Sequence, residues 1–253
     1  MSEKQRGQDY LTNVTGKLEA IEAKGAEQFK KAGAMIADAY AADRLVHVYG
    51  GGGHTCLMIA EMFFRAGGFA NINPIIGHDI TPFCQSLKYL EVERTTGYAN
   101  ALIRYYKVSE GDLLIIFHNI GANPTTIDAA EEAKKRGAKI IAVSSSDWAE
   151  KLPKEHHIRH PNKKHLFDYA DLKIDDMNPY GDADFYVEGF DVPIAPTSTM
   201  VDAFIAHRMV IEAVAAMVER GLEPPVFRSA NLPDGDAFNA ALIERYDSRV
   251  KDL

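Results

Sequence analysis

The sequence of 253 residues lacks the features that mark secreted and membrane proteins. Its two cysteines, Cys56 and Cys84, are too few for a disulfide framework, which indicates a reducing compartment. The segment 1–9 is charged and has no apolar core of signal-peptide length. No later apolar run reaches the roughly 18–20 residues that a membrane helix needs. We therefore expect a soluble, cytoplasmic protein with no membrane partner.

The sequence also has fewer basic than acidic residues: it contains 28 Lys and Arg and 36 Asp and Glu, which gives a formal net charge of −8. A nucleic-acid surface needs clustered Lys and Arg, and the sequence has no such cluster outside one short loop, so we expect no nucleic-acid partner. With 46% hydrophobic residues the chain can bury a large core. We expect a single domain over 1–253, with an N-terminal helical extension (1–43), an α/β core (44–196) and C-terminal helices (197–253).

Both ends of the chain show helical patterns. Apolar residues recur at helical spacing from Leu11 to Tyr40, which predicts one long helix or two consecutive ones. Thr197–Gly221 and Asp236–Lys251 predict two more, and Pro196 precedes the first of these. These helices carry more apolar surface than one small sheet can cover. We therefore expect a homodimer or homotetramer, with the functional site at a subunit interface.

The middle of the chain alternates short apolar runs with helical patterns. Five runs read as strands, over 45–50, 69–76, 112–117, 138–143 and 170–174. Such alternation is typical of a parallel sheet covered by helices on both faces, whose ligand site lies at the carboxyl ends of the strands. The polar turns after these runs fall on that edge. The segments 147–169 and 175–196 have no clear period, and we expect a loop or flap followed by irregular chain.

Four glycines, Gly50 to Gly53, follow the first predicted strand and precede His54 and Thr55. Glycines allow a sharp turn and close approach to a ligand, and a helix start offers unpaired N–H groups to an anionic or hydroxyl-rich molecule. A dinucleotide-binding fingerprint does not fit, because its third glycine would fall on Thr55 or Cys56. A P-loop lacks its Gly-Lys-Ser/Thr. A purely structural tight turn is the alternative.

Several short motifs occur in a fairly specific order along almost the whole chain: Gly51–Thr55, Ala60–Gly68, Asn119–Asn123, Ser144–Ser146 and Ala195–Thr199. In this order they resemble the SIS (sugar isomerase) domain family, most closely a subgroup of stand-alone SIS proteins with helices at both ends. The resemblance implies a three-layer α/β/α fold with a central five-stranded parallel sheet. It also implies a small-molecule sugar or sugar phosphate as ligand, with no cofactor and no metal.

The resemblance also suggests substrate-binding positions. These are Gly51, Gly53, His54 and Thr55 on one side of the sugar, Ser144, Ser145, Thr197, Ser198 and Thr199 on other walls, and His118, Asn119 and Asn123 in the turn after the third predicted strand. The family typically has Ser-x-Ser-Gly in that turn, and this chain has His118 to Gly121 instead. Ile120 cannot donate a hydrogen bond, so we expect the anionic end of the ligand to be held differently or not to be a phosphate.

Aldose–ketose isomerisation needs a base beside the carbonyl, and a carboxylate suffices. The candidates are Glu61 in the first core helix and Glu91 or Glu93 in the polar turn before Gly97. We favour Glu93. The alternatives are that Glu61 is a solvated or salt-bridged helix residue, and that Glu93 forms a surface pair with its neighbour in sequence.

Histidine is the expected partner of the carboxylate. His54 and His78 are the histidines best placed to handle a proton, although His54 could simply cap its helix. His207, among apolar residues of the C-terminal helix, reads as a core or interface residue, with a role in the site as the alternative. The four histidines between 156 and 165 do not have a recurrent metal-ligand spacing, and no metal site is expected there.

Together these observations predict a cytoplasmic sugar isomerase that works through an enediol on a phosphosugar or another sugar derivative with an anionic end. Two alternatives stay open. A non-catalytic carbohydrate-binding protein would keep the turns without a base, and an amino-sugar phosphate lyase or etherase would need a second acid for the leaving group.

Overall fold

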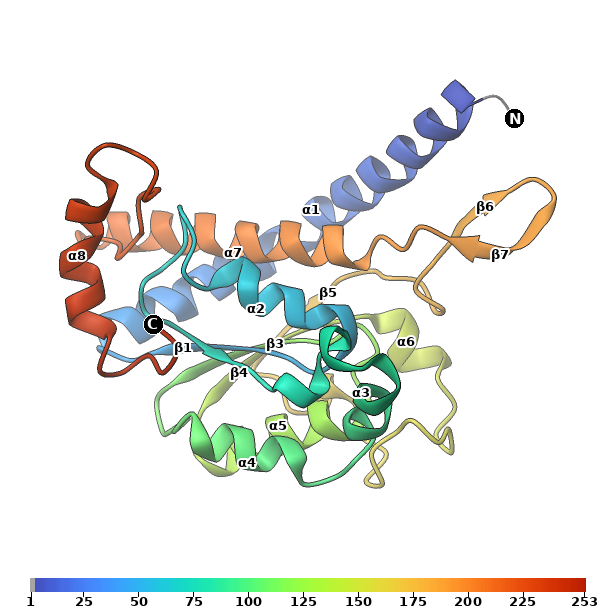
Figure 1. Ribbon diagram of the computed structural model, residues 1–253, viewed down its shortest axis with the longest axis horizontal. Coiled ribbons are helices and arrows are strands. Elements are labelled where there is room, and N and C mark those ends of the chain that lie inside the picture. Colours follow the sequence, from blue (N-terminus) through green and yellow to red (C-terminus); the bar gives the residue numbers. More distant parts are fainter. Residues whose placement is uncertain (1–2) are drawn as a thin grey trace.

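The computed structural model describes residues 3–253, apart from the side chains of residues 3, 4 and 84. Its centre is a five-stranded parallel sheet in the order β2-β1-β3-β4-β5 (Figure 1). The strands are β1 (Val46–Gly50), β2 (Ile72–Ile75), β3 (Leu113–Phe117), β4 (Lys139–Ser144) and β5 (Leu172–Asp175). The α/β fold with a five-stranded parallel sheet, expected from the sequence, is confirmed.

The apolar character of the strands follows from their burial on both faces. In β3, Leu113 and Ile115 pack into one hydrophobic cluster, while Leu114 and Ile116 pack into the other. Because successive side chains of a strand point to opposite faces, a strand with two covered faces has no polar alternation. The uninterrupted apolar run Leu113–Phe117, every residue of which is buried, is therefore required by the fold.

Three helices cover one face of the sheet: α1 (Glu3–Ala41), α2 (Leu57–Met62) and α7 (Ser198–Glu219). The long α1 and α7 lie side by side over this face (Figure 1). At their contact the backbones come so close that a Cβ added to Gly33 would lie 2.5 Å from the backbone carbon of Glu212.

The other face carries α3 (Ser86–Glu93), α4 (Tyr98–Tyr105) and α5 (Pro124–Lys135). The short α6 (Ser146–Lys151) follows β4, and α8 (Gly235–Tyr246) lies near the C-terminus, at the end of the molecule far from the N-terminus (Figure 1). Four short 3-10 turns complete the helical elements: η1 (Gly53–Cys56), η2 (His78–Ile80), η3 (Pro82–Cys84) and η4 (Leu166–Asp168).

The structure differs from the sequence-based expectation in one extended segment. The chain between β5 and α7, expected to be irregular, contains an antiparallel hairpin of β6 (Phe185–Val187) and β7 (Phe190–Ile194). The hairpin projects from the body beside the N-terminal part of α1 (Figure 1). The rings of Tyr10 and Phe185 meet edge to face at 5.5 Å, and Lys17 pairs with Asp184 at 2.6 Å.

The N-terminal pattern forms one continuous helix, the first of the two alternatives that the sequence predicts. The first core helix ends early, at Met62, because Phe63 is extended and Phe64 has a φ of 44°. Glu93, expected in a turn, is the last residue of α3.

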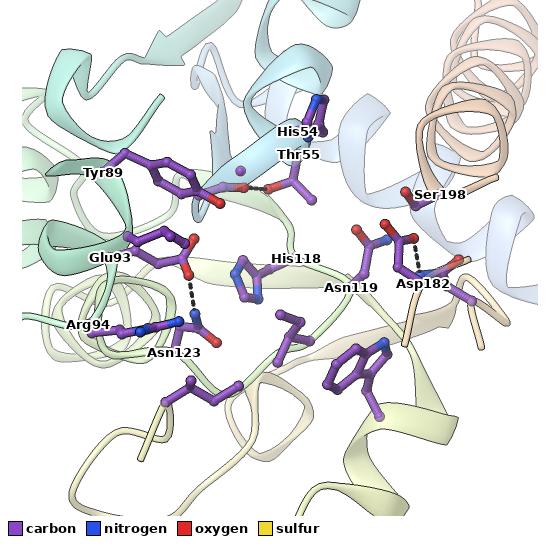
Figure 2. Close-up of a pocket in the computed structure, with 17 residues that line it drawn as sticks. His54, Thr55, Tyr89, Glu93, Arg94, His118, Asn119, Asn123, Asp182 and Ser198 are labelled. Atoms are coloured by element: carbon purple, nitrogen blue, oxygen red, sulfur yellow. Dashed lines mark hydrogen bonds between the residues drawn. The ribbon is translucent and has the colours of Figure 1, made fainter. Parts of the chain in front are cut away.

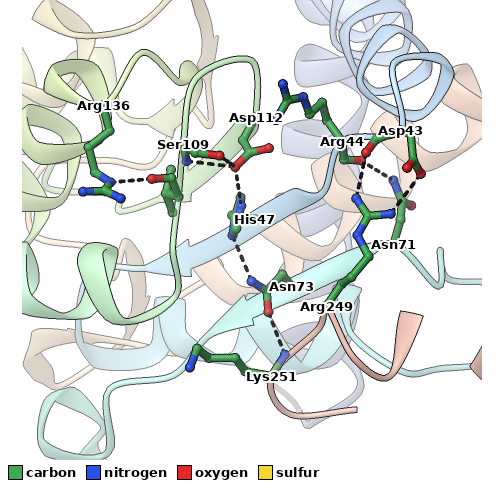
Figure 3. Close-up of polar contacts among 11 residues, drawn as sticks. Asp43, Arg44, His47, Asn71, Asn73, Ser109, Asp112, Arg136, Arg249 and Lys251 are labelled. Atoms are coloured by element: carbon green, nitrogen blue, oxygen red, sulfur yellow. Dashed lines mark hydrogen bonds and ion pairs between the residues drawn. The ribbon is translucent and has the colours of Figure 1, made fainter. Parts of the chain in front are cut away.

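At the edge of the sheet opposite the carboxyl ends, a buried polar chain joins the C-terminal segment to the strands (Figure 3). His47 on β1 lies 3.3 Å from Asp112 and 3.1 Å from the amide of Asn73. Asn73 in turn accepts a hydrogen bond from the backbone N–H of Lys251 at 3.3 Å. His47 is 1% exposed, so this histidine links parts of the core.

Among the described residues, no helix is both long enough and apolar enough to span a membrane. Cys56 is a free thiol. We expect no disulfide between Cys56 and Cys84, but the side chain of Cys84 lies outside the part that the structure describes.

Candidate functional site

A polar cavity of about 240 Å³ opens at the carboxyl ends of β1 and β3, where the glycine turn, α3, the turn after β3 and the start of α7 meet (Figure 2). Eight residues predicted for the site line it: Gly53, His54, Thr55, Glu93, His118, Asn119, Asn123 and Ser198. The structure thus brings together side chains that are up to 145 positions apart, as the parallel sheet predicts.

The glycine turn allows the carboxylate of α3 to lie against the backbone. Gly52 has a φ of 147°, and a Cβ added there would lie 2.9 Å from the carboxyl carbon of Glu93. Gly53 also has a positive φ, of 55°. The Thr55 hydroxyl donates to the carbonyl oxygen of Gly52 at 2.5 Å and closes the turn. Any side chain at position 52 would therefore displace Glu93 from the cavity wall.

Glu93 is 5% exposed and accepts a hydrogen bond from the amide of Asn123. Burial raises the pKa of Glu93 to about 7, and the Asn123 hydrogen bond and nearby Arg94 only partly oppose the shift. A carboxyl group with this pKa can both take up and release a proton near neutral pH. The alternative of a surface ion pair is wrong, because Glu93 is buried while Arg94 is exposed.

This pKa makes a prediction for stability. The ordinary value is 4.5, so the folded state holds the proton more tightly than the unfolded state does. The stabilisation is full below pH 4.5 and is lost as the pH rises through about 7. The difference in unfolding free energy between wild type and Glu93→Gln should therefore fall by about 2–3 kcal/mol over this range. Urea unfolding at several pH values measures it; a flat or rising difference would contradict the buried, protonated carboxyl.

His118 follows β3 and is 3% exposed. Its Nδ1 accepts the N–H of Gly121 at 2.8 Å, so the ring proton of the neutral form is on Nε2. Burial, together with His165, lowers the pKa of His118 to about 3. The imidazole is therefore neutral and keeps one N–H at physiological pH.

Asn119 is held by two buried carboxyl groups. Its Nδ2 donates to Asp176 at 2.8 Å and to Asp202 at 3.0 Å, and both acids are 1% exposed. Burial raises the pKa of both carboxyl groups, and the neighbouring Asp176 raises that of Asp202 further, so the pair retains a proton near neutral pH. Because both amide hydrogens are used, Asn119 has only its carbonyl oxygen left for a ligand.

Of the five hydroxyl residues predicted for the other walls, only Ser198 is in the described lining of the cavity. Ser144 donates to the backbone oxygen of His118 at 2.7 Å, and Ser145 donates to that of Asn178 at 2.6 Å. Thr197 accepts from Lys17 at 2.8 Å. Thr199 lies outside the cavity lining as well. The expectation that these four residues form walls is corrected, because the first three hydroxyls hold the surrounding chain in place.

Gly51 also lies behind the cavity rather than in its wall, where its carbonyl oxygen accepts from Thr125 at 2.8 Å. His78 is exposed and borders a separate apolar hollow beside Cys56. His78 therefore does not line the cavity that contains Glu93, where it was expected to assist.

Glu61 is not brought to the cavity either. It lies in the last turn of α2 and pairs with Arg65 and with His207 of α7, the latter at 2.7 Å. This is the salt-bridged role that the sequence left open for Glu61. His207 is half-exposed in that pair and is not a core residue.

Other cavity residues were not predicted: Gly52, Tyr89, Leu90, Arg94, Ile120, Trp148, Ile158, Asn178 and Asp182. Tyr89 precedes Glu93 by four residues on α3, so a helix prediction there would have placed both on one face. Asp182 comes from the loop before the hairpin, and no local pattern marks it. In the part of the chain that the structure describes, no three His, Cys, Asp or Glu side chains are grouped to hold a metal ion.

Comparison with known proteins assigns the class. The family model of the SIS domain matches residues 9–145, and the chain belongs to the SIS domain family. Among its relatives, a UPF0309 protein of Listeria monocytogenes is 34% identical over 242 residues, which are 96% of each chain. A UPF0309 protein of Halalkalibacterium halodurans is 33% identical over 241 residues, which are 95% of this chain and 94% of that protein.

Solved structures show the same fold. The phosphoheptose isomerase GmhA of Neisseria gonorrhoeae superposes with a TM-score of 0.55 at 13% identity, over 84% of this chain and 99% of that one. A phosphoheptose isomerase of Francisella tularensis gives 0.53 at 12% identity, over 85% and 100%. At 12–13% identity, these superpositions show a shared fold alone.

Proposed function

We propose that the protein is a sugar isomerase that interconverts an aldose and a ketose through an enediol, acting on a phosphosugar or another sugar derivative with an anionic end. The observation that carries the proposal is the buried carboxyl of Glu93, whose pKa is about 7, in the wall of a small polar cavity. The SIS family and the shared fold with phosphoheptose isomerases support it.

In the proposed reaction Glu93 acts as the base. Its carboxylate removes the proton from C2 of the aldose, the C2–H electrons form the C1=C2 bond, and the carbonyl electrons move to O1. The hydroxyl proton of O2 then passes to O1. As the C2=O2 bond forms, Glu93 returns its proton to C1, which gives the ketose. A carboxyl with a pKa near neutrality suits both the removal and the return of the proton.

The anionic end has a binding position at the start of α7. Ser198 lines the cavity, and Thr197 at the helix N-cap makes no side-chain bond to the first turn. The N–H groups of this 22-residue helix start and its dipole favour an anion. Asn119 cannot help through N–H groups, since both are bound to carboxyls. The anion is therefore held differently from one in a Ser-x-Ser-Gly turn, and phosphate, carboxylate and sulfonate are all to be tested.

We further propose that the protein works in the cytoplasm as a homodimer or homotetramer. Large apolar side chains stand more than half exposed on the hairpin, at Tyr186 and Phe190, and on α7, at Ile211 and Val218. Apolar surface of this kind is usually covered by a partner subunit.

A ligand screen tests the function. Melting temperatures are measured with aldose and ketose phosphates, the corresponding sugar acids and sulfosugars, since a ligand of the folded state raises the melting temperature. Each ligand found is then incubated with the protein in D₂O. We expect deuterium to enter the carbon beside the carbonyl. Binding without exchange would instead identify a carbohydrate-binding protein, and loss of a substituent from the sugar would identify a lyase or etherase.

A further inference from the structure

We propose that the neutral imidazole of His118 is the hydrogen-bond donor that polarises the carbonyl group of the sugar and then stabilises the enediolate. This inference rests on the isomerase function proposed above and adds a second catalytic residue to Glu93. The sequence predicts His118 only as a binding residue, and it predicts His54 and His78 as the catalytic histidines.

The first observation is the position of the ring. His118 lies at the carboxyl end of the central strand β3 and lines the cavity between Glu93 and Asn119 (Figure 2). A sugar carbon facing the carboxyl group of Glu93 therefore has its oxygen next to the imidazole. His118 is 3% exposed, so its ring is largely shielded from water.

The second observation is that the backbone fixes which nitrogen carries the proton. Gly121 has a φ of 64° and turns its N–H back to Nδ1 of His118. Nδ1 is thereby an acceptor, and Nε2 carries the hydrogen. Nε2 has no hydrogen-bond partner among the residues that the structure describes. The structure thus provides one oriented N–H that a ligand can use.

The third observation is that three of the neighbouring donor groups already have acceptors in the protein. The Thr55 hydroxyl donates to Gly52, and the amide of Asn123 donates to Glu93. The amide of Asn119 donates to the two buried acids. The Nε2–H of His118 is in contrast a preorganised donor that is free to bind negative charge developing on O1 next to Glu93. In a dry site such a donor is worth far more in the transition state than in water.

The proton balance is unchanged by this role. His118 keeps its Nε2 hydrogen throughout and hydrogen-bonds first to O1 and then to O2, as charge moves from one oxygen to the other. Glu93 carries the carbon-bound proton in both directions. A neutral imidazole can serve as such an electrophile.

Two substitutions separate catalysis from structure. His118→Asn keeps an acceptor for the N–H of Gly121 but removes the donor at Nε2. His118→Gln loses that acceptor and keeps a donor near the position of Nε2. We expect His118→Asn to lower kcat about 100-fold with KM within about threefold, and His118→Gln to stay within about tenfold of wild type. The control is His165→Asn. His165 is a buried neighbour outside the cavity lining, and asparagine can still accept the N–H of Phe167. The kcat of this control variant should equal that of wild type.

Two further measurements do not need a known substrate. The first is ¹⁵N NMR of protein labelled in the histidine rings, in which the His118 signals are assigned by their loss in His118→Asn. We expect a protonated Nε2 and an unprotonated Nδ1 from pH 5 to 8. The titratable groups around His118 are Glu93 and His165. The enediolate mimic 5-phospho-D-arabinonohydroxamate should bind wild type at least tenfold more tightly than 5-phospho-D-arabinonate does, and His118→Asn should remove this preference.

The outcomes are distinct. Three results would each overturn the role of His118 and leave the isomerase function standing. They are undiminished deuterium exchange by His118→Asn, an equal loss of kcat in His118→Asn and His118→Gln, and a doubly protonated His118 ring at pH 7. Wild-type protein that neither binds nor exchanges any of the sugars or analogues would overturn the proposed function, and the role of His118 with it.

Discussion

Replacing Glu93 with glutamine should lower kcat for the proposed isomerisation by about a thousandfold and remove deuterium exchange to the same extent. Glutamine has nearly the same shape and can keep a hydrogen bond with Asn123, but it cannot accept a proton from carbon. Since Glu93 is buried against the glycine turn, the variant loses its charge and keeps its packing. Mass spectrometry measures deuterium exchange, and circular dichroism of the same samples shows whether the variant is folded.

The matched control is Glu61→Gln, the other carboxylate that the sequence proposed as the base. Glu61 lies outside the cavity and pairs with Arg65 and His207, so its removal should change kcat by less than about threefold. In wild type, kcat/KM should rise with pH through an apparent pKa near 7, that of Glu93. Equal losses in both variants, or activity retained in Glu93→Gln, would show that the base is elsewhere.

Replacing Gly33 with alanine should destabilise the protein by about 3 kcal/mol, although alanine is the better helix former. A Cβ at position 33 would lie 2.5 Å from the backbone carbon of Glu212 and 2.7 Å from the backbone nitrogen of Ala213. Because these are backbone atoms of α7, no side-chain rotation can relieve the overlap, and the two long helices must move apart.

Gly16 on the same helix provides the control. A Cβ there meets nothing within 4 Å, so Gly16→Ala should stabilise the protein by about 0.5–1 kcal/mol through helix propensity alone. Chemical unfolding of the two variants measures both effects. Equal signs for the two substitutions would contradict the close approach of α1 and α7.

The fold was predictable because its strands are short and covered on both sides. The unbroken apolar runs Leu113–Phe117 and Ile140–Val143, with helical patterns between the strands, predict the sheet. The hairpin between β5 and α7 escaped prediction, because it is largely exposed and has no core face to impose a pattern. The division of the domain at residues 43 and 196, and the cytoplasmic location, stay predictions.

The candidate site was predictable only in part. A parallel sheet brings the turns after its strands together, so Thr55, Asn119 and Ser198 do line one cavity. Sequence does not tell which way a side chain turns at a strand end, and Ser145 turns to the backbone of Asn178 instead. Glu61 was misplaced because α2 ends early, at Met62, and puts it in the last turn near His207.

The two hydrogen bonds of the Asn119 amide have a mechanical consequence. Asp176 follows β5 and Asp202 belongs to the start of α7, so one side chain fastens the central strand to an edge strand and to a terminal helix. A shift of α7 along its own axis, such as one imposed by a neighbouring subunit, would pull directly on the cavity wall. A partner that moved α7 would thereby change the cavity through the amide of Asn119.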